Sequence, residues 1–388
     1  MKTSVLLKQA KPVIRIFALI GAVAFLVQAC ASGAPAAVGT AWSKPASDLF
    51  DRGMLFAERM DFDSAIECFN EAINIDPDFA EAFMQRGKAY ITKQPMQTRS
   101  LKKNRFLLLA LDGYVKNEEV DLAIADLTQA IKLEPDNSDA YAFRSVIYSS
   151  IWEPDNALAD SNKAITLDPN NAVGYLARGI ASLRDKGRKD DFSQAIKLDP
   201  NFAEAYIWRS FFFLGEDMGK AIEDCSKAIM LDPNDVNFYC IRGSEYLEKG
   251  DCDSAIADFS QAIMLDPDWA MGYNGRGGAY FKKGDYDSAI ANYSRAIMLD
   301  PGWGAGGYYV RGGVHFEKGD YDSAIADFSQ AIMLDPGLVD VYNLRGDAYF
   351  EKGDYDSAIA DYNQAIRLWP DNSTYRDNLE KAIQAKGN

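Results

Sequence analysis

The chain has 388 residues, of which 48% are hydrophobic and 25% are charged, a balance that is ordinary for a folded soluble protein and excludes a disordered polymer. Its 57 acidic and 41 basic residues give a formal charge of −16. Such a field repels phosphate backbones, so nucleic acid is not expected as a partner.

The first 30 residues have the pattern of a secretory signal. Basic residues precede an apolar run from Ile16 to Val27, which at about 12 residues is too short to span a bilayer comfortably. The run ends in VQAC, which resembles the bacterial lipobox, although Gln28 is atypical. This resemblance implies lipidation of Cys30 and anchoring in the cell envelope, at the outer membrane or the periplasmic face. Plain secretion after cleavage near Ala31 or Ala36 stays open, as does a retained anchor helix.

After residues 31–45, which are expected to form a flexible tether, the chain repeats one pattern. The stretch KGDYDSAIADFSQAIMLDP at 318–336 recurs at 249–267 with a single change. One unit cannot cover its own apolar face, so such repetition favours a stack of like units. Nine units, separated by gaps of 58, 34, 31, 33, 34, 34, 35 and 34 residues, end at Pro77, Pro135, Pro169, Pro200, Pro233, Pro267, Pro301, Pro336 and Pro370.

Each unit has the periodicity of two amphipathic helices. Apolar residues of the second helix of the eighth unit share one stripe: Ala324, Ile325, Phe328, Ala331 and Ile332. In the first helix of the ninth unit, the residues that share a face are Tyr342, Arg345, Gly346 and Tyr349. Gly353 is expected to end that helix in the left-handed conformation, Asp354 to cap the next, and Pro370 to stop it. Residues 371–388 are expected to form a capping helix.

These residues resemble the tetratricopeptide repeat, a helix-turn-helix unit of about 34 residues. In the seventh unit the matching residues are Tyr273, Arg276, Gly277, Tyr280, Ala289, Tyr293, Ala296 and Pro301. The resemblance covers about residues 46–370 and implies an all-α fold, an α-solenoid of about nine repeats wound into a right-handed superhelix. Two departures are systematic, because Tyr usually replaces the family's Trp and Arg replaces its Leu.

The departing arginine occurs in all nine units, as Arg52, Arg86, Arg144, Arg178, Arg209, Arg242, Arg276, Arg311 and Arg345. An aspartate recurs at one position of the second helix, as Asp126, Asp160, Asp191, Asp224, Asp258, Asp327 and Asp361. We predict a ladder of partly buried Arg–Asp pairs between neighbouring helices. The alternative is a row of arginines that bind anions.

In the tetratricopeptide family, the first helices of the units line a concave groove that binds peptides or partner helices. By position, the resemblance places on that groove Phe211, Cys240, Met271, Asn274, Tyr309, Asn343 and Asp347. It implies a non-enzymatic scaffold that binds a segment of another envelope protein, without a cofactor or a small-molecule substrate. Two other functions stay open: an envelope enzyme that acts on glycans through paired carboxylates, and an architectural protein that self-associates through its repeats.

Two stretches differ from the other units. A basic insertion at about 91–117 predicts either a helix that packs its leucines on the stack or a contact for a membrane surface or an acidic partner. The stretch WRSFFFLGE, with Trp208 and Phe211, predicts core packing, with an aromatic anchor pocket as the alternative. The fourth unit lacks three residues and the eighth has one more, and both changes predict kinks in the superhelix.

The sequence offers no evident catalytic or metal-binding motif. Its only histidine, His315, stands where neighbouring units have Tyr280 and Tyr349, and it is expected to be a packing residue. The internal cysteines are expected to be small buried apolar residues. A disulfide between Cys225 and Cys240 stays open in an oxidising compartment.

Overall fold

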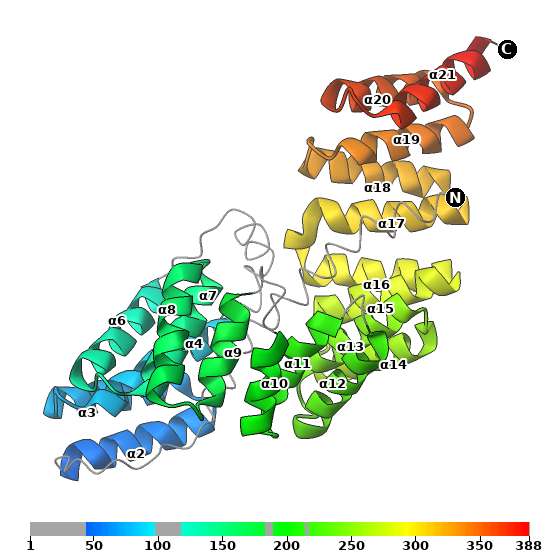
Figure 1. The fold of residues 1–388 in the computed structure, drawn as a ribbon. Coiled ribbons are helices and arrows are strands. Elements are labelled where there is room, and N and C mark those ends of the chain that lie inside the picture. The colour runs from blue at the N-terminus through cyan, green and yellow to red at the C-terminus, as the bar shows by residue number, and fades with distance from the viewer. Residues whose placement is uncertain (1–43, 98–117, 183–188, 214–216, 388) are drawn as a thin grey trace. The chain divides into compact units, whose positions relative to one another are not determined.

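The computed structural model describes residues 44–97, 118–182, 189–213 and 217–387. Within these ranges the chain forms helices and turns and no β-strand, which confirms the all-α fold (Figure 1). The predicted signal with Cys30, nearly all of the predicted tether, and most of the insertion lie outside the described residues. In the described ranges, no helix has both the length and the apolar character that a membrane span requires.

The chain divides between residues 238 and 239 into two compact parts, each of which is described here by itself. We call the first helix of each unit an A helix and the second a B helix. The helices of the first part are α2 (Lys44–Glu58), α3 (Phe62–Ile75), α4 (Ala80–Gln97), α6 (Glu118–Leu133), α7 (Ser138–Ser150), α8 (Pro154–Leu167), α9 (Ala172–Ala181), α10 (Lys189–Leu198), α11 (Ala203–Phe213) and α12 (Met218–Leu231).

The dividing point lies near the start of α13 (Val236–Lys249). In the second part, Figure 1 shows successive helices from α16 to α21 lying side by side, and the A helices α15, α17 and α19 each pack between two B helices. The remaining helices are α14 (Cys252–Leu265), α15 (Ala270–Lys283), α16 (Tyr286–Leu299), the 3-10 turn η1 (Pro301–Trp303), α17 (Gly304–Lys318), α18 (Tyr321–Leu334), α19 (Val339–Glu351), α20 (Tyr355–Leu368) and α21 (Ser373–Gly387).

The A and B helices of a unit approach closely where a glycine of one meets an aromatic ring of the other. A Cβ atom on Gly312 of α17 would lie 2.9 Å from the ring of Phe328 on α18, a ring that is fully buried. Gly346 of α19 has the same relation to Tyr362 of α20, at 2.8 Å. Close contact between a glycine and an aromatic ring therefore forms part of the core of the eighth and ninth units.

The turn between the A and B helices uses the predicted residues. Gly319 and Gly353 have φ values of 84° and 80°, and Asp354 accepts a hydrogen bond from the Ser357 N–H at the start of α20. Among the turns that the structure describes, two depart from this rule, because Met60 and Trp152 occupy the left-handed region with φ values of 59° and 60°. Side chains with a Cβ are strained in that conformation.

The extra residue of the eighth unit lies in the segment before α17. Pro301 to Trp303 form the 3-10 turn η1, and Gly304 follows with a φ of 43°. At the other end of this part, α21 packs Tyr375 and Ala382 inward, with exposed fractions of 2% and 0%. These two side chains cover the apolar faces of the ninth unit.

Candidate functional site

The recurring arginines form the predicted ladder. In seven units the guanidinium donates two hydrogen bonds, from Nε and Nη2, to both carboxylate oxygens of the predicted aspartate, at 2.6 to 2.9 Å. The aspartate side chains are 7–9% exposed and the arginine side chains 15–23%. In Arg311 these bonds raise the pKa of the guanidinium despite its burial. Such paired geometry leaves little of each guanidinium for an external anion.

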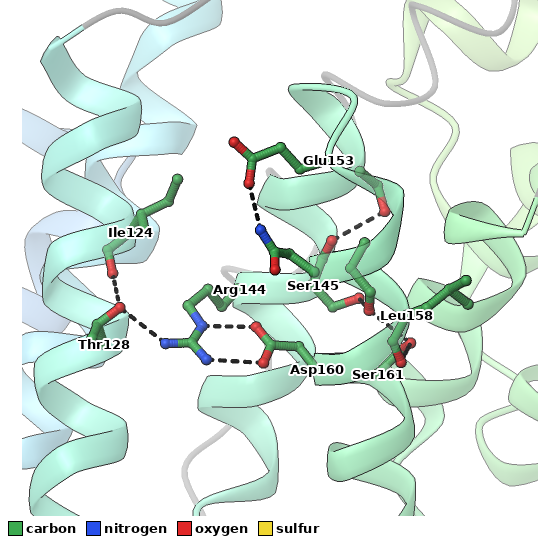
Figure 2. Close-up of polar contacts among 11 residues, drawn as sticks. Ile124, Thr128, Arg144, Ser145, Glu153, Leu158, Asp160 and Ser161 are labelled. Carbon is green, nitrogen blue, oxygen red and sulfur yellow. Dashed lines mark hydrogen bonds and ion pairs between the residues drawn. The ribbon is translucent and has the colours of Figure 1, made fainter.

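Most of these arginines also bind the B helix of the preceding unit, which the sequence analysis did not predict. Figure 2 shows Arg144 between Asp160 of α8 and Thr128 of α6, with 2.9 Å from Nη1 to Thr128 Oγ1. The corresponding acceptors of other units are Asn70, Asn162, Ser193, Ser260, Ser294 and Ser329. Each of these guanidinium groups therefore joins three helices.

Two units differ in the partner of the arginine. Asn292 replaces the aspartate in the seventh unit, and its Oδ1 accepts a hydrogen bond from Arg276 Nε at 2.8 Å. In the first unit Cys68 stands at the aspartate position, and the side chain of Arg52 is exposed. Burial raises the pKa of the Cys68 thiol, and the positive charge of Arg52 opposes that rise.

A second, unpredicted ladder lies on the surface of the second part. A lysine at the end of an A helix pairs with an aspartate in the first turn of the preceding B helix, as in Lys283 with Asp253 and Lys318 with Asp287, both at 2.5 Å. Lys352 with Asp322 and Lys386 with Asp356 continue the row. These pairs are exposed, so each one contributes little to stability.

The residues assigned by resemblance to the groove lie on the A helices. Four of them occupy equivalent positions on α13, α15, α17 and α19, and we call this set the A-helix row: Cys240, Asn274, Tyr309 and Asn343. Cys240 is 4% exposed, whereas the other three are half-buried. Within the described residues, the side-chain amide of Asn274 makes no hydrogen bond.

The chemistry of the A-helix row changes along its length. On α19, Asn343 and Asp347 accept hydrogen bonds from Asn378 of α21 at 3.0 and 3.3 Å. Asp347 also accepts one from the Tyr362 hydroxyl at 2.8 Å. These two groove candidates are therefore already bound by the protein itself. The groove candidates on α15 and α17 are Met271, Asn274 and Tyr309, and all three are half-buried.

Tyr309 combines an apolar ring with a polar end. Its ring packs against the buried cluster around Phe328 and Val341. Burial raises the pKa of its hydroxyl, and the nearby carboxylate of Asp340 raises it further. The hydroxyl therefore stays protonated at neutral pH and keeps its capacity to donate a hydrogen bond.

Phe211 and its aromatic neighbours lie in the first part of the chain. Trp208 is fully buried and stacks on Phe192 of α10, with ring centroids 6.3 Å apart. Phe211 lies edge-on to Trp208 at 5.8 Å and is half-buried. These contacts favour the core-packing interpretation of this stretch.

The histidine and two of the cysteines that the sequence analysis considered do not form a catalytic or metal-binding site with other described residues. His315 is mostly buried, with Nδ1 3.3 Å from Asp320 Oδ2, and no disulfide joins Cys225 to Cys240. The described part of the chain contains no group of three or more His, Cys, Asp or Glu side chains placed to hold a metal ion.

The repeat geometry agrees with comparisons to known families. Models of the tetratricopeptide repeat match residues 53–94, 108–172, 243–284, 270–302 and 309–373. This chain is a tetratricopeptide repeat protein. No curated protein matches its sequence.

Several solved structures resemble this tetratricopeptide repeat protein. The Cut9–Hcn1 hetero-tetramer of the APC/C shares 20% identity with a TM-score of 0.52, over 87% of this chain and 76% of that chain. A tetratricopeptide repeat protein from Parabacteroides merdae shares 17% identity with a TM-score of 0.48, over 63% and 98%. YrrB, whose description names an unusual peptide-binding site, shares 22% identity with a TM-score of 0.41, over 51% and 98%. The first of these likenesses supports the α-solenoid fold.

Proposed function

We propose that this protein is a scaffold of the bacterial cell envelope, anchored by a lipid on Cys30, which binds an extended peptide or a helix of another envelope protein along its A helices. The tetratricopeptide fold supports a role in protein–protein interaction. The envelope location rests on the signal pattern and VQAC, and the binding surface rests on the A-helix row.

The observation that carries the binding surface is the contrast between α15 and α19. Asn343 on α19 already binds Asn378, whereas the equivalent Asn274 on α15 has no hydrogen-bond partner among the described side chains and backbone groups. Asn274 carries both a donor and an acceptor, as peptide backbone recognition requires. Tyr309 on α17 adds a hydroxyl and an aromatic edge.

A photo-crosslinking experiment in cells tests the binding surface. A photoreactive residue at position 274 or 309 is expected to capture a discrete partner, and the same residue at Met298 is not. Met298 is a matched control because it belongs to the neighbouring B helix and is 68% exposed. Asn274→Ala combined with Tyr309→Ala should weaken capture from position 271. Identical adducts from positions 274 and 298 would contradict the proposed surface.

Two further measurements test the rest of the proposal. A labelled fatty acid should be incorporated into the parent protein and not into Cys30→Ala, and equal labelling of the two would contradict the anchor. Purified protein should release no product from envelope glycans. Sedimentation at several concentrations separates a partner-binding scaffold from an array that associates with itself.

A further inference from the structure

The loop before an A helix can place one side chain beside the A helix of the preceding unit. This side chain stands two positions after the unit-ending proline. Between α7 and α9 it is Asn171, whose Nδ2 donates to Asp139 Oδ1 at 2.8 Å. The Oδ1 of Asn171 accepts from the Gly174 N–H and caps α9. One amide thus serves two helices, as a donor to one and an acceptor for the other.

Sequence positions show the same matching in other units. In four units the A helix carries an acid four positions after the proline that ends the preceding unit. The residue two positions after the next unit-ending proline is then asparagine in all cases but one. The asparagine pairs are Glu81 with Asn137, Asp139 with Asn171, and Asp340 with Asn372. The exception is Glu204 of α11, whose counterpart is Asp235.

Both carboxyl groups of this exceptional pair are buried, with exposed fractions of 8% for Glu204 and 5% for Asp235. Asp235 Oδ1 accepts from the Asn237 N–H at 2.7 Å, and thereby does the capping that Asn171 Oδ1 does for α9. Asp235 Oδ2 is the counterpart of the amide nitrogen of Asn171. In the part of the chain that the structure describes, this oxygen has no hydrogen-bond partner.

The charges around the pair are of the same sign. The negative charges of Asp199 after α10 and Asp232 at the end of α12 raise the pKa of Glu204. Asp232 also raises the pKa of Asp235. Within the pair, Asp235 repels the Glu204 carboxylate. Burial is the largest influence, and with these acids it raises the pKa of both groups to about 7. Two buried carboxylates that repel each other resist double ionisation.

We propose that Glu204 and Asp235 share one proton, and that its loss at alkaline pH loosens the contact of α11 with the segment 232–238. The protonated carboxyl oxygen donates the hydrogen bond that the Asn171 amide donates to Asp139 between α7 and α9. The pair is therefore a pH-sensitive contact at a position where the other units that carry this acid have asparagine.

The sign of the effect follows from proton linkage. The folded pair holds its proton up to about pH 7, whereas the unfolded carboxyls lose theirs near their ordinary pKa values of 4.5 and 3.8. The folded state therefore binds more protons between these limits, so stability falls as pH rises through this window and stays lower above it. Across the whole window, a pKa difference of this size between the folded and unfolded states of one group changes a local opening equilibrium on the order of 100-fold.

Hydrogen exchange at pH 5.5 and 8.5, corrected for intrinsic exchange rates, tests the proposal on the full chain. For the loss of one proton, amides in 199–213 and 217–238 of the parent should open about 30-fold more often at pH 8.5, because pH 5.5 lies about 1.5 units below the folded pKa. Asp235→Asn, which recreates the asparagine arrangement, should remove most of that difference. The reverse change, Asn171→Asp, should introduce a comparable pH dependence around α7 and α9.

Two outcomes would overturn the shared proton. One is a pH dependence in Asp235→Asn that equals that of the parent; the other is faster opening of this variant than of the parent at pH 8.5. Glu204→Gln provides the second variant, because it removes the other carboxyl and keeps the Asp235 cap. If both neutral variants failed to fold at pH 8.5, ionised carboxyls would be required and the proposal would be wrong.

Discussion

Removal of the Asp327 carboxylate is the sharpest test of the Arg–Asp ladder. Asp327 accepts two hydrogen bonds from Arg311, at 2.9 and 2.8 Å, and its side chain is 9% exposed. Removing one partner of a buried ion pair costs about 3–5 kcal/mol. Arg311 keeps its bond to Ser294 at 2.8 Å and its position over the Tyr308 ring, and its side chain is 21% exposed. We therefore expect Asp327→Ala to cost about 3 kcal/mol, the lower end of the range.

A graded pair of variants makes this prediction specific. Asp327→Asn should cost only about 1 kcal/mol, because it reproduces the natural Arg276–Asn292 contact. Hydrogen exchange in α17 and α18 is the suitable assay, because a repeat array need not unfold in one step. The alanine variant should accelerate exchange about 100-fold. Asp322→Ala, which removes an exposed lysine partner, is the control, and an equal effect of the two alanine variants would refute the ladder's role.

Three further predictions concern the packing and the turns. Phe328→Ala should leave a cavity that costs about 3–5 kcal/mol in urea unfolding, and a loss below about 1 kcal/mol would show that the unit collapses around the gap. Trp152→Gly should raise the free energy of unfolding by about 1 kcal/mol because it relieves a left-handed φ, whereas Gly319→Ala should lower it by a similar amount. Gly275→Ala should lower the thermal midpoint, because its Cβ would lie 2.3 Å from the Phe259 ring; an unchanged midpoint would mean that the ring moves freely.

Much of the fold could be predicted because its determinants recur in register. Asp327 and Asp361 stand at one position of their units, so the pairs with Arg311 and Arg345 followed from spacing alone. The third contact, which most of the arginines make, was missed because its acceptor varies among Asn, Thr and Ser. A signal was present nevertheless, since the acceptor Ser329 stands two residues after Asp327, as Thr128 does after Asp126.

The candidate site was less predictable, because exposure depends on neighbours that break the repeat. Asn274 and Asn343 occupy equivalent positions, yet only Asn343 meets Asn378, which belongs to the helix that ends the array. Cys240 was placed on the groove by position, and its burial comes from packing that position alone does not reveal. The assignment of these residues to a binding surface stays a prediction, as does lipidation of Cys30.

The near identity of residues 249–267 and 318–336, which form the second helices of the sixth and eighth units, has a consequence for how the chain reaches its native state. A newly formed hairpin that offers Arg311 and Ser329 presents the same chemistry as one that offers Arg242 and Ser260, so docking out of order would satisfy many of the same contacts. The seventh unit distinguishes them, because Asn292 accepts fewer hydrogen bonds than the aspartate and η1 lengthens the following connection. The residues that differ between units thus disfavour docking of the units in the wrong order.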